Sequence, residues 1–107
     1  MKLCITSKED NIDSDLDPRF GRCQYFIIKD TENDNYEIIK NNNIDATGGA
    51  GIQSAQLIVS KQVNTLLTGK VGPNALRVLD SAGVKIISDV SGSVKEVIEN
   101  FDKGLLK

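Results

Sequence analysis

The chain has 107 residues, a mass of 11.6 kDa and a formal net charge of −2, with 39% hydrophobic and 26% charged residues. This length suits one domain over residues 1–107, and the composition argues against a disordered tail or a membrane protein. The slightly acidic charge argues against a nucleic-acid partner, because phosphate binding normally needs a basic face. The first residues turn polar too quickly for a signal peptide, so we expect a cytoplasmic protein.

The first half of the chain predicts three strands joined without helices. A short apolar run over residues 3–6 predicts the first strand, and residues 24–29 and 36–40 predict a hairpin closed by a turn over 30–35. Residues 8–21 are dense in Asp, Asn, Ser, Pro and Gly, which predicts a long loop. We expect the acidic side chains of this loop to be solvated; they are Glu9, Asp10, Asp13, Asp15 and Asp17.

The second half predicts helices alternating with strands. Ile52, Ala55 and Val59 recur at helical spacing after a glycine cluster, and residues 63–68 and 84–88 read as strands. A second helix opens at Pro73 and stops at Gly83, because proline suits the first helical position and glycine a helix end. A third helix begins with a Ser93–Glu96 capping box and closes at Gly104.

The resulting β-β-β-α-β-α-β-α order predicts a mixed sheet whose second half is parallel. Its loops over residues 7–22, 41–51, 69–74 and 89–93 should then meet at one edge, where open α/β sheets bind ligands. Of the nine glycines, seven fall in these loops: Gly21, Gly48, Gly49, Gly51, Gly69, Gly72 and Gly92. Backbone N–H groups, helix starts and the cations Arg19, Arg22 and Lys70 predict an anion site. No phosphate-loop or dinucleotide motif accompanies it.

Three segments carry a family resemblance. Asp-Pro-Arg-Phe-Gly-Arg-Cys at 17–23, Ala-Thr-Gly-Gly-Ala-Gly at 46–51 and Thr-Gly-Lys-Val-Gly-Pro-Asn-Ala at 68–75 resemble the dinitrogenase iron–molybdenum cofactor biosynthesis family. That group includes NifX-like and NafY-like carriers, the C-terminal domain of some NifB proteins and the orange protein. The resemblance covers almost the whole chain. It implies a three-layer, ribonuclease H-like α/β fold with strand order 3-2-1-4-5.

The resemblance also implies a function. It implies a non-enzymatic carrier of an anionic metal–sulfur cluster or its precursor, either iron–molybdenum cofactor-like or a molybdenum/copper–sulfide, with cluster donor or acceptor proteins as partners. The expected cofactor-binding residues are Arg19, Phe20, Gly21, Arg22, Gly48, Gly49, Gly51, Gly69, Lys70, Val71, Gly72 and Asn74. Several cluster-carrying members have a histidine just before the Phe-Gly pair, where this chain has Arg19. A guanidinium does not coordinate metals, but it can retain an anionic thiometallate by its charge, and Cys23 nearby is a candidate soft metal ligand.

Structural interpretations of the same residues stay open. Cys23 and Cys4 also fit as small buried apolar side chains, and Phe20 fits as a plug that anchors the loop in the core. The glycines near residue 50 also fit a tight helix start. Arg19 and Arg22 also fit as partners of the acids in their own loop.

Other function classes remain as alternatives or are excluded. The chain has no histidine for a catalytic triad, and the strands over 3–6 and 63–68 carry no carboxylates for a ribonuclease H-like metal centre. The main alternative is a cofactor-free interaction module that docks on a partner such as an iron–sulfur assembly ATPase. A binder of small phosphates is a third candidate.

Overall fold

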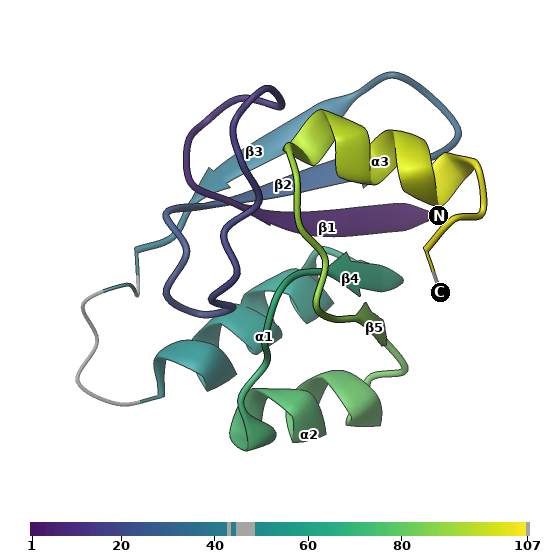
Figure 1. Cartoon of the computed structure of the whole chain (residues 1–107). Helices are drawn as coiled ribbons and strands as arrows, with labels where there is room; N and C mark the ends of the chain where they lie inside the picture. Colours follow the sequence, from purple (N-terminus) through teal and green to yellow (C-terminus); the bar gives the residue numbers. More distant parts are fainter. Residues whose placement is uncertain (43, 45–48, 107) are drawn as a thin grey trace.

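The computed structural model describes residues 1–42, 44 and 49–106 (Figure 1). The elements occur in the order that the sequence predicts. They are β1 (Lys2–Ser7), β2 (Tyr25–Asp30), β3 (Tyr36–Lys40), α1 (Ala50–Ser60), β4 (Thr65–Leu67), α2 (Pro73–Ser81), β5 (Lys85–Ile87) and α3 (Val94–Asp102).

The five strands form one mixed sheet in the order β3-β2-β1-β4-β5, which confirms the expected topology. β2 pairs antiparallel with both β1 and β3, whereas β1, β4 and β5 run parallel. Strands β1, β3, β4 and β5 therefore all end at the same edge of the sheet, which we call the carboxyl edge.

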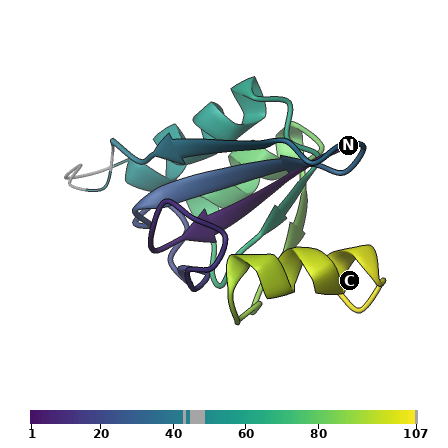
Figure 2. The ribbon, with the colours of Figure 1, turned by 90° about the horizontal axis from the view of Figure 1, so that it is seen from above.

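Helices cover both faces of the sheet, so the molecule has three layers (Figure 2). Side chains alternate between the faces along each strand, as the twofold repeat of a strand requires. On β1, Cys4 joins the core under α1 and α2, whereas Leu3 and Ile5 join the core under α3. The sequence of β1 is therefore mostly apolar, because both faces of this central strand are buried.

The local helix signals are confirmed. Ser93 Oγ accepts from the Glu96 backbone N–H at 3.1 Å, and Glu96 Oε1 accepts from the Ser93 backbone N–H at 3.2 Å. Pro73 is the first residue of α2, and Gly83 follows that helix in the left-handed conformation at φ 76°. A left-handed residue suits glycine because it has no Cβ to clash.

Strands β4 and β5 are shorter than the sequence predicted, with three residues each. Val63 donates its backbone N–H to Ile58 of α1, and Val84 donates to Leu79 of α2. These residues therefore belong to the turns that end the helices, although their apolar side chains continue the strand pattern. No helix among the described residues is long and apolar enough to cross a membrane.

Candidate functional site

The loop over residues 17–22, which we call the arginine loop, is anchored beside the loop that follows β4. Lys70 donates its backbone N–H to Pro18 O at 2.8 Å, and Phe20 donates to Lys70 O at 3.2 Å. At the start of the arginine loop, Thr6 Oγ1 of β1 donates to Asp17 O at 2.6 Å. Two segments about fifty residues apart in the sequence thus run side by side at the carboxyl edge (Figure 1). We call this assembly of loops the rim.

Glycines permit this close approach. A Cβ added to Gly69 would lie 2.4 Å from Pro18 O, and one added to Gly21 would lie 2.9 Å from the Cα of Gly51. Both distances are far shorter than a van der Waals contact, so larger residues would push the arginine loop away. Gly21 also adopts φ 92°, which other residues rarely reach. Packing within the rim therefore accounts for Gly21 and Gly69.

Phe20 fixes the arginine loop to the core. Its side chain is only 7% exposed, and its ring lies 6.0 Å from that of Phe26 in a tilted arrangement that aromatic pairs favour. The exposed part of Phe20 lines two neighbouring depressions of the rim. The structure therefore supports the plug interpretation of Phe20 and places its outer face at the candidate site as well.

The starts of two helices meet at one of these depressions. Gly49 precedes α1 and Gly72 precedes α2. Among the residues that the structure describes, no side chain caps either helix, and neither helix has an acidic residue in its first turn. A hollow of about 250 Å³ lies between them, lined by Phe20, Gly49, Gly51, Ile52, Gly72, Pro73, Asn74 and Ala75. Uncapped helix starts present N–H donors and partial positive charge. The hollow is therefore suited to an anion.

A second depression of about 600 Å³ adjoins the first. It is lined by Pro18, Arg19, Phe20, Gly69, Lys70, Asp89 and Val90. Lys70 is exposed, and its ammonium makes no hydrogen bond or ion pair within the described part of the chain. Arg19, by contrast, is paired with Asp17, and Asp89 adds a further carboxylate. The two cations are thus matched by two acids, so this depression is less positive than the sequence suggested.

Asp17 corrects one sequence expectation. Its side chain is 1% exposed, whereas the acids of its loop were expected to be solvated. The carboxylate accepts hydrogen bonds from Arg19 Nε and Nη2 and from the Arg19 backbone N–H. These three bonds replace the water that burial removes.

Cys23 lies in the hydrophobic core with Cys4, and both are free thiols. Burial, followed by the charge of Asp17, raises the pKa of the Cys23 thiol to about 12. A thiol in this state holds its proton at neutral pH and is a poor metal ligand. Among the described residues, no three His, Cys, Asp or Glu side chains cluster as metal ligands would. The ligand role of Cys23 stays a prediction that this burial counts against.

Most of the expected binding residues do meet at the rim. Those that line its depressions are Arg19, Phe20, Gly49, Gly51, Gly69, Lys70, Gly72 and Asn74, and Gly21 packs against Gly51 beside them. Val71 lines an adjoining depression of about 300 Å³ with Leu76 and Ile86. Arg22 donates from its guanidinium to Ile44 O at 2.6 Å. Gly48 lies outside the described residues. Whether these residues bind a cofactor stays a prediction.

The sequence reasoning missed several lining residues, namely Pro18, Ile52, Pro73, Ala75, Asp89 and Val90. The position of these residues in the predicted fold could have identified them. Ile52 and Ala75 lie in the first turns of helices at the carboxyl edge, and Asp89 follows β5 there. Position at that edge, rather than residue type, is the common feature.

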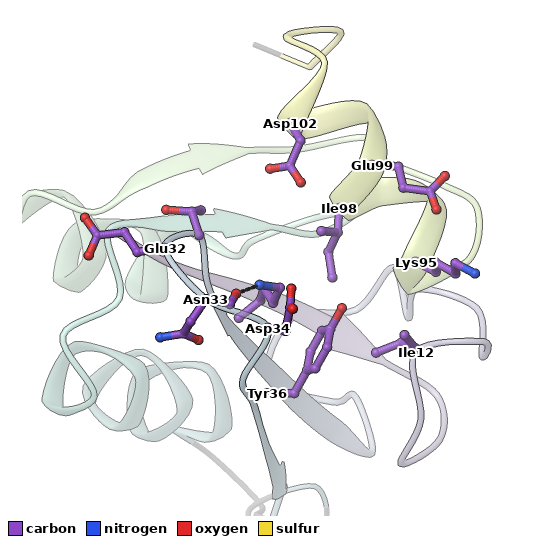
Figure 3. A pocket seen from close by; sticks show the side chains of 11 residues that line it. Ile12, Glu32, Asn33, Asp34, Tyr36, Lys95, Ile98, Glu99 and Asp102 are labelled. Carbon is purple, nitrogen blue, oxygen red and sulfur yellow. Dashed lines mark hydrogen bonds between the residues drawn. The ribbon is translucent and has the colours of Figure 1, made fainter.

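A pocket elsewhere in the molecule has a net negative lining. It measures about 460 Å³ and lies between the β2–β3 turn and α3 (Figure 3). Its lining holds four carboxylates, from Glu32, Asp34, Glu99 and Asp102, against two lysines, Lys29 and Lys95, so it is negative on balance. Burial and neighbouring carboxylates also raise the pKa of Tyr36 at its wall. An anion would be repelled here, so the rim is the better anion site.

The fold and rim define a class: a small, three-layer α/β domain whose loops gather at the carboxyl ends of the strands, beside helix starts. The sequence profile described as "Dinitrogenase iron-molybdenum cofactor" matches residues 1–104. The chain therefore belongs to the dinitrogenase iron–molybdenum cofactor family, as the three sequence segments suggested.

Individual relatives agree with this assignment. The apo form of the orange protein from Desulfovibrio gigas superposes with a TM-score of 0.94 at 32% identity, covering 99% of this chain and 90% of that one. A candidate NifB protein from Thermotoga gives 0.87 at 40% identity over the same shares. An uncharacterized protein of Methanocaldococcus jannaschii is 36% identical over 95 residues, which are 86% of this chain and 80% of that protein.

Proposed function

We propose that this chain is a small cytoplasmic carrier, without catalytic activity, that holds an anionic metal–sulfur cluster or its precursor at the rim. The cargo is of the iron–molybdenum cofactor or thiomolybdate type. Membership of a family named for the iron–molybdenum cofactor supports the cargo class. The arrangement of the rim supports the place.

One observation carries the proposal: two helix starts, neither of them capped by a side chain in the described part of the chain, open onto the same hollow. The third helix of the chain shows that this is a local feature, because α3 begins with a complete capping box and an acid, Glu96. An acid or a capping oxygen at α1 or α2 would occupy the N–H donors. The bare starts leave those donors available to an anion from outside.

Each part of the rim has a role in this proposal. The first-turn N–H groups of α1 and α2, such as those of Gly51 and Ala75, would donate to sulfide or oxide atoms of the cargo. Lys70 would add a full positive charge beside them. The exposed face of Phe20 would contact the less polar sulfide surface. Together these groups offset charge without a covalent bond to the protein.

Arg19 and Cys23 have smaller roles in the proposal than the resemblance implied. Arg19 is 65% exposed but shares its charge with Asp17, so it contributes a weaker field than an unpaired cation would. Cys23 would reach a metal only if the arginine loop moved away from the core. The proposed retention is therefore electrostatic in its main part.

The test is anaerobic loading of the purified chain with tetrathiomolybdate, with and without copper(I). The proposal expects visible absorption bands that stay with the protein through gel filtration, and a rise in melting temperature as ligand accumulates. A colourless protein with an unchanged melting temperature would contradict it. Inorganic phosphate serves as the comparison ligand, since a general phosphate site would respond to it equally.

A carrier also needs a donor or acceptor protein, and one feature of the rim favours docking. Leu76 of α2 is 39% exposed beside Val71 and Ile86, in the depression that adjoins Lys70. Exposed apolar side chains next to a ligand site suit contact with a partner. An iron–sulfur assembly ATPase is one such partner class. A pull-down with metal-free protein separates cargo-dependent docking from a cofactor-free interaction module.

A further inference from the structure

The outer edge of the sheet at β3 has hydrogen-bonding groups that point away from the molecule. Asn41 donates its backbone N–H to Gln24 O at 2.9 Å, and β2 pairs Ile39 with Phe26 and Glu37 with Ile28. Bonded pairs alternate along an antiparallel ladder. The backbone groups of Tyr36, Ile38 and Lys40 therefore face outward, away from β2.

Nothing in the described part of the chain covers this edge. In Figure 1 β3 is the uppermost strand, and Figure 2 looks down onto it with α1 and α3 on either side. Tyr36 is 40% exposed and Ile38 is 44% exposed. The outward backbone groups of Tyr36, Ile38 and Lys40 have no partner among the residues that the structure describes.

The opposite edge of the sheet is built differently. β5 has three residues and begins with an exposed lysine, Lys85, whereas β3 has five residues in unbroken register and contains no proline. Short length, lysine and proline are the usual features that keep an edge from pairing. The β3 edge has only Lys40, at its end, and is otherwise suited to pairing with another strand.

We propose that two copies of this chain associate through their β3 edges, antiparallel, about a twofold axis at Ile38. The outward groups match in this register, because Ile38 then faces Ile38 of the second copy and each Tyr36 faces a Lys40. Both kinds of pair use residues whose backbone groups point outward. The two sheets become one continuous sheet across the dimer.

The side chains are complementary in the same register. Lys40 of each copy lies opposite a Tyr36 ring, a cation–aromatic pairing that the chain already uses within itself, where Lys29 Nζ lies 5.4 Å from the centre of that ring. Glu37 points to the other face and keeps its own ion pair with Lys61 at 2.8 Å. The two isoleucines cover one another at the axis, where they lose contact with water.

In this dimer, association and cargo binding do not depend on each other. Because the paired strands run in opposite directions, the carboxyl edges of the two copies point to opposite ends of the joint sheet. Each rim stays open. Failure of the dimer would therefore leave the proposed carrier function untouched, and failure of cargo binding would leave the dimer untouched.

The test measures mass in solution by light scattering and by sedimentation equilibrium, from micromolar to millimolar protein. The wild-type chain should pass from monomer to dimer in this range. Ile38→Lys and Ile38→Glu each place like charges face to face at the axis, so each should raise the dimer dissociation constant about tenfold or more. An equal mixture of the two variants pairs Lys with Glu and should restore association.

Matched controls separate the edge from general charge effects. Leu105→Lys adds the same charge at a side chain that is 67% exposed near the C-terminal end, and it should dimerise as the wild type does. Circular dichroism checks that each variant is folded. A wild type that stays monomeric throughout, a dimer that both Ile38 variants retain, or a mixture that does not recover association would overturn the proposal. So would a monomeric chain whose edge instead binds an extended peptide.

Discussion

The carboxylate of Asp17 holds the guanidinium of Arg19 at two points: Oδ1 lies 3.2 Å from Nε, and Oδ2 lies 3.2 Å from Nη2. The same carboxylate accepts the Arg19 backbone N–H at 3.0 Å. A loop that the sequence presents as a source of positive charge thus contains its own counter-charge. Lys70, which has no such partner in the described chain, becomes the main unpaired cation of the rim.

Replacing Asp17 should strengthen cargo retention. Asp17→Asn keeps the size of the side chain but removes the negative charge, so the Arg19 guanidinium gains a net positive field at the rim. We expect tighter binding of tetrathiomolybdate, together with a loss of about 1–2 kcal/mol in the free energy of unfolding because charge-assisted hydrogen bonds weaken. Calorimetric titration and urea unfolding measure the two effects. Weaker binding by a folded Asp17→Asn protein would show that the pair itself builds the site.

Removing the Lys70 ammonium should weaken retention. We expect Lys70→Ala to lower tetrathiomolybdate affinity about threefold to tenfold, as one partly exposed charge at a helix start would. The difference should shrink in high salt, because mobile ions screen exposed charges. Lys85→Ala makes the same change at the opposite end of the sheet, where β5 begins, and should bind normally. Equal affinities of the two variants would exclude a role for Lys70.

Two glycines of the rim should respond differently to substitution. Gly72 has an extended backbone at φ −68° and ψ 162°, and a Cβ there meets nothing within 4 Å. Gly72→Val should therefore fold normally while its side chain obstructs the hollow and lowers cargo affinity. Gly69→Ala forces a Cβ against Pro18 and should cost about 1–3 kcal/mol of stability. Thermal unfolding and titration of both variants check this pair, and unimpaired binding by Gly72→Val would place the cargo elsewhere.

The buried cysteines should make the fold sensitive to alkali. An ordinary thiol ionises near pH 9, but burial and Asp17 raise the pKa of Cys23 to about 12 and burial raises that of Cys4. Between these values the unfolded chain releases protons that the folded chain keeps, so the free energy of unfolding falls as pH rises. Urea unfolding at pH about 8 and about 10 measures the fall. Cys23→Ala should show a shallower fall than the wild type; an identical fall would contradict the assigned pKa.

Local signals in the sequence were sufficient for most of the fold. The capping residues Ser93 and Glu96 marked the start of α3, and Pro73 marked that of α2, because these signals act within a few residues. The predicted strands over residues 63–68 and 84–88 were too long, because β4 covers Thr65–Leu67 and β5 covers Lys85–Ile87. Val63 and Val84 continue an apolar run, and only their hydrogen bonds to the preceding helices remove them from the strands.

The sequence was sufficient to predict where the candidate site lies, but not the charge of the groups around it. Loop positions at the carboxyl edge follow from the order of the elements, so Phe20, Lys70 and Gly72 could be grouped without coordinates. The burial of Asp17 could not, because it depends on the exact path of a loop that turns back on its own arginine. The presence of Asp89 beside Lys70 likewise depends on the turn after β5.

The central claim is that the rim, through its two uncapped helix starts, binds an anionic thiometallate. Amide NMR of the ¹⁵N-labelled chain during titration with tetrathiomolybdate measures this residue by residue. The account predicts saturable shifts confined to the amides of Gly51, Ile52, Lys70, Asn74 and Ala75 and their neighbours. Shifts that are absent, or that gather around Tyr36 and Glu99 at the acidic pocket, would contradict it.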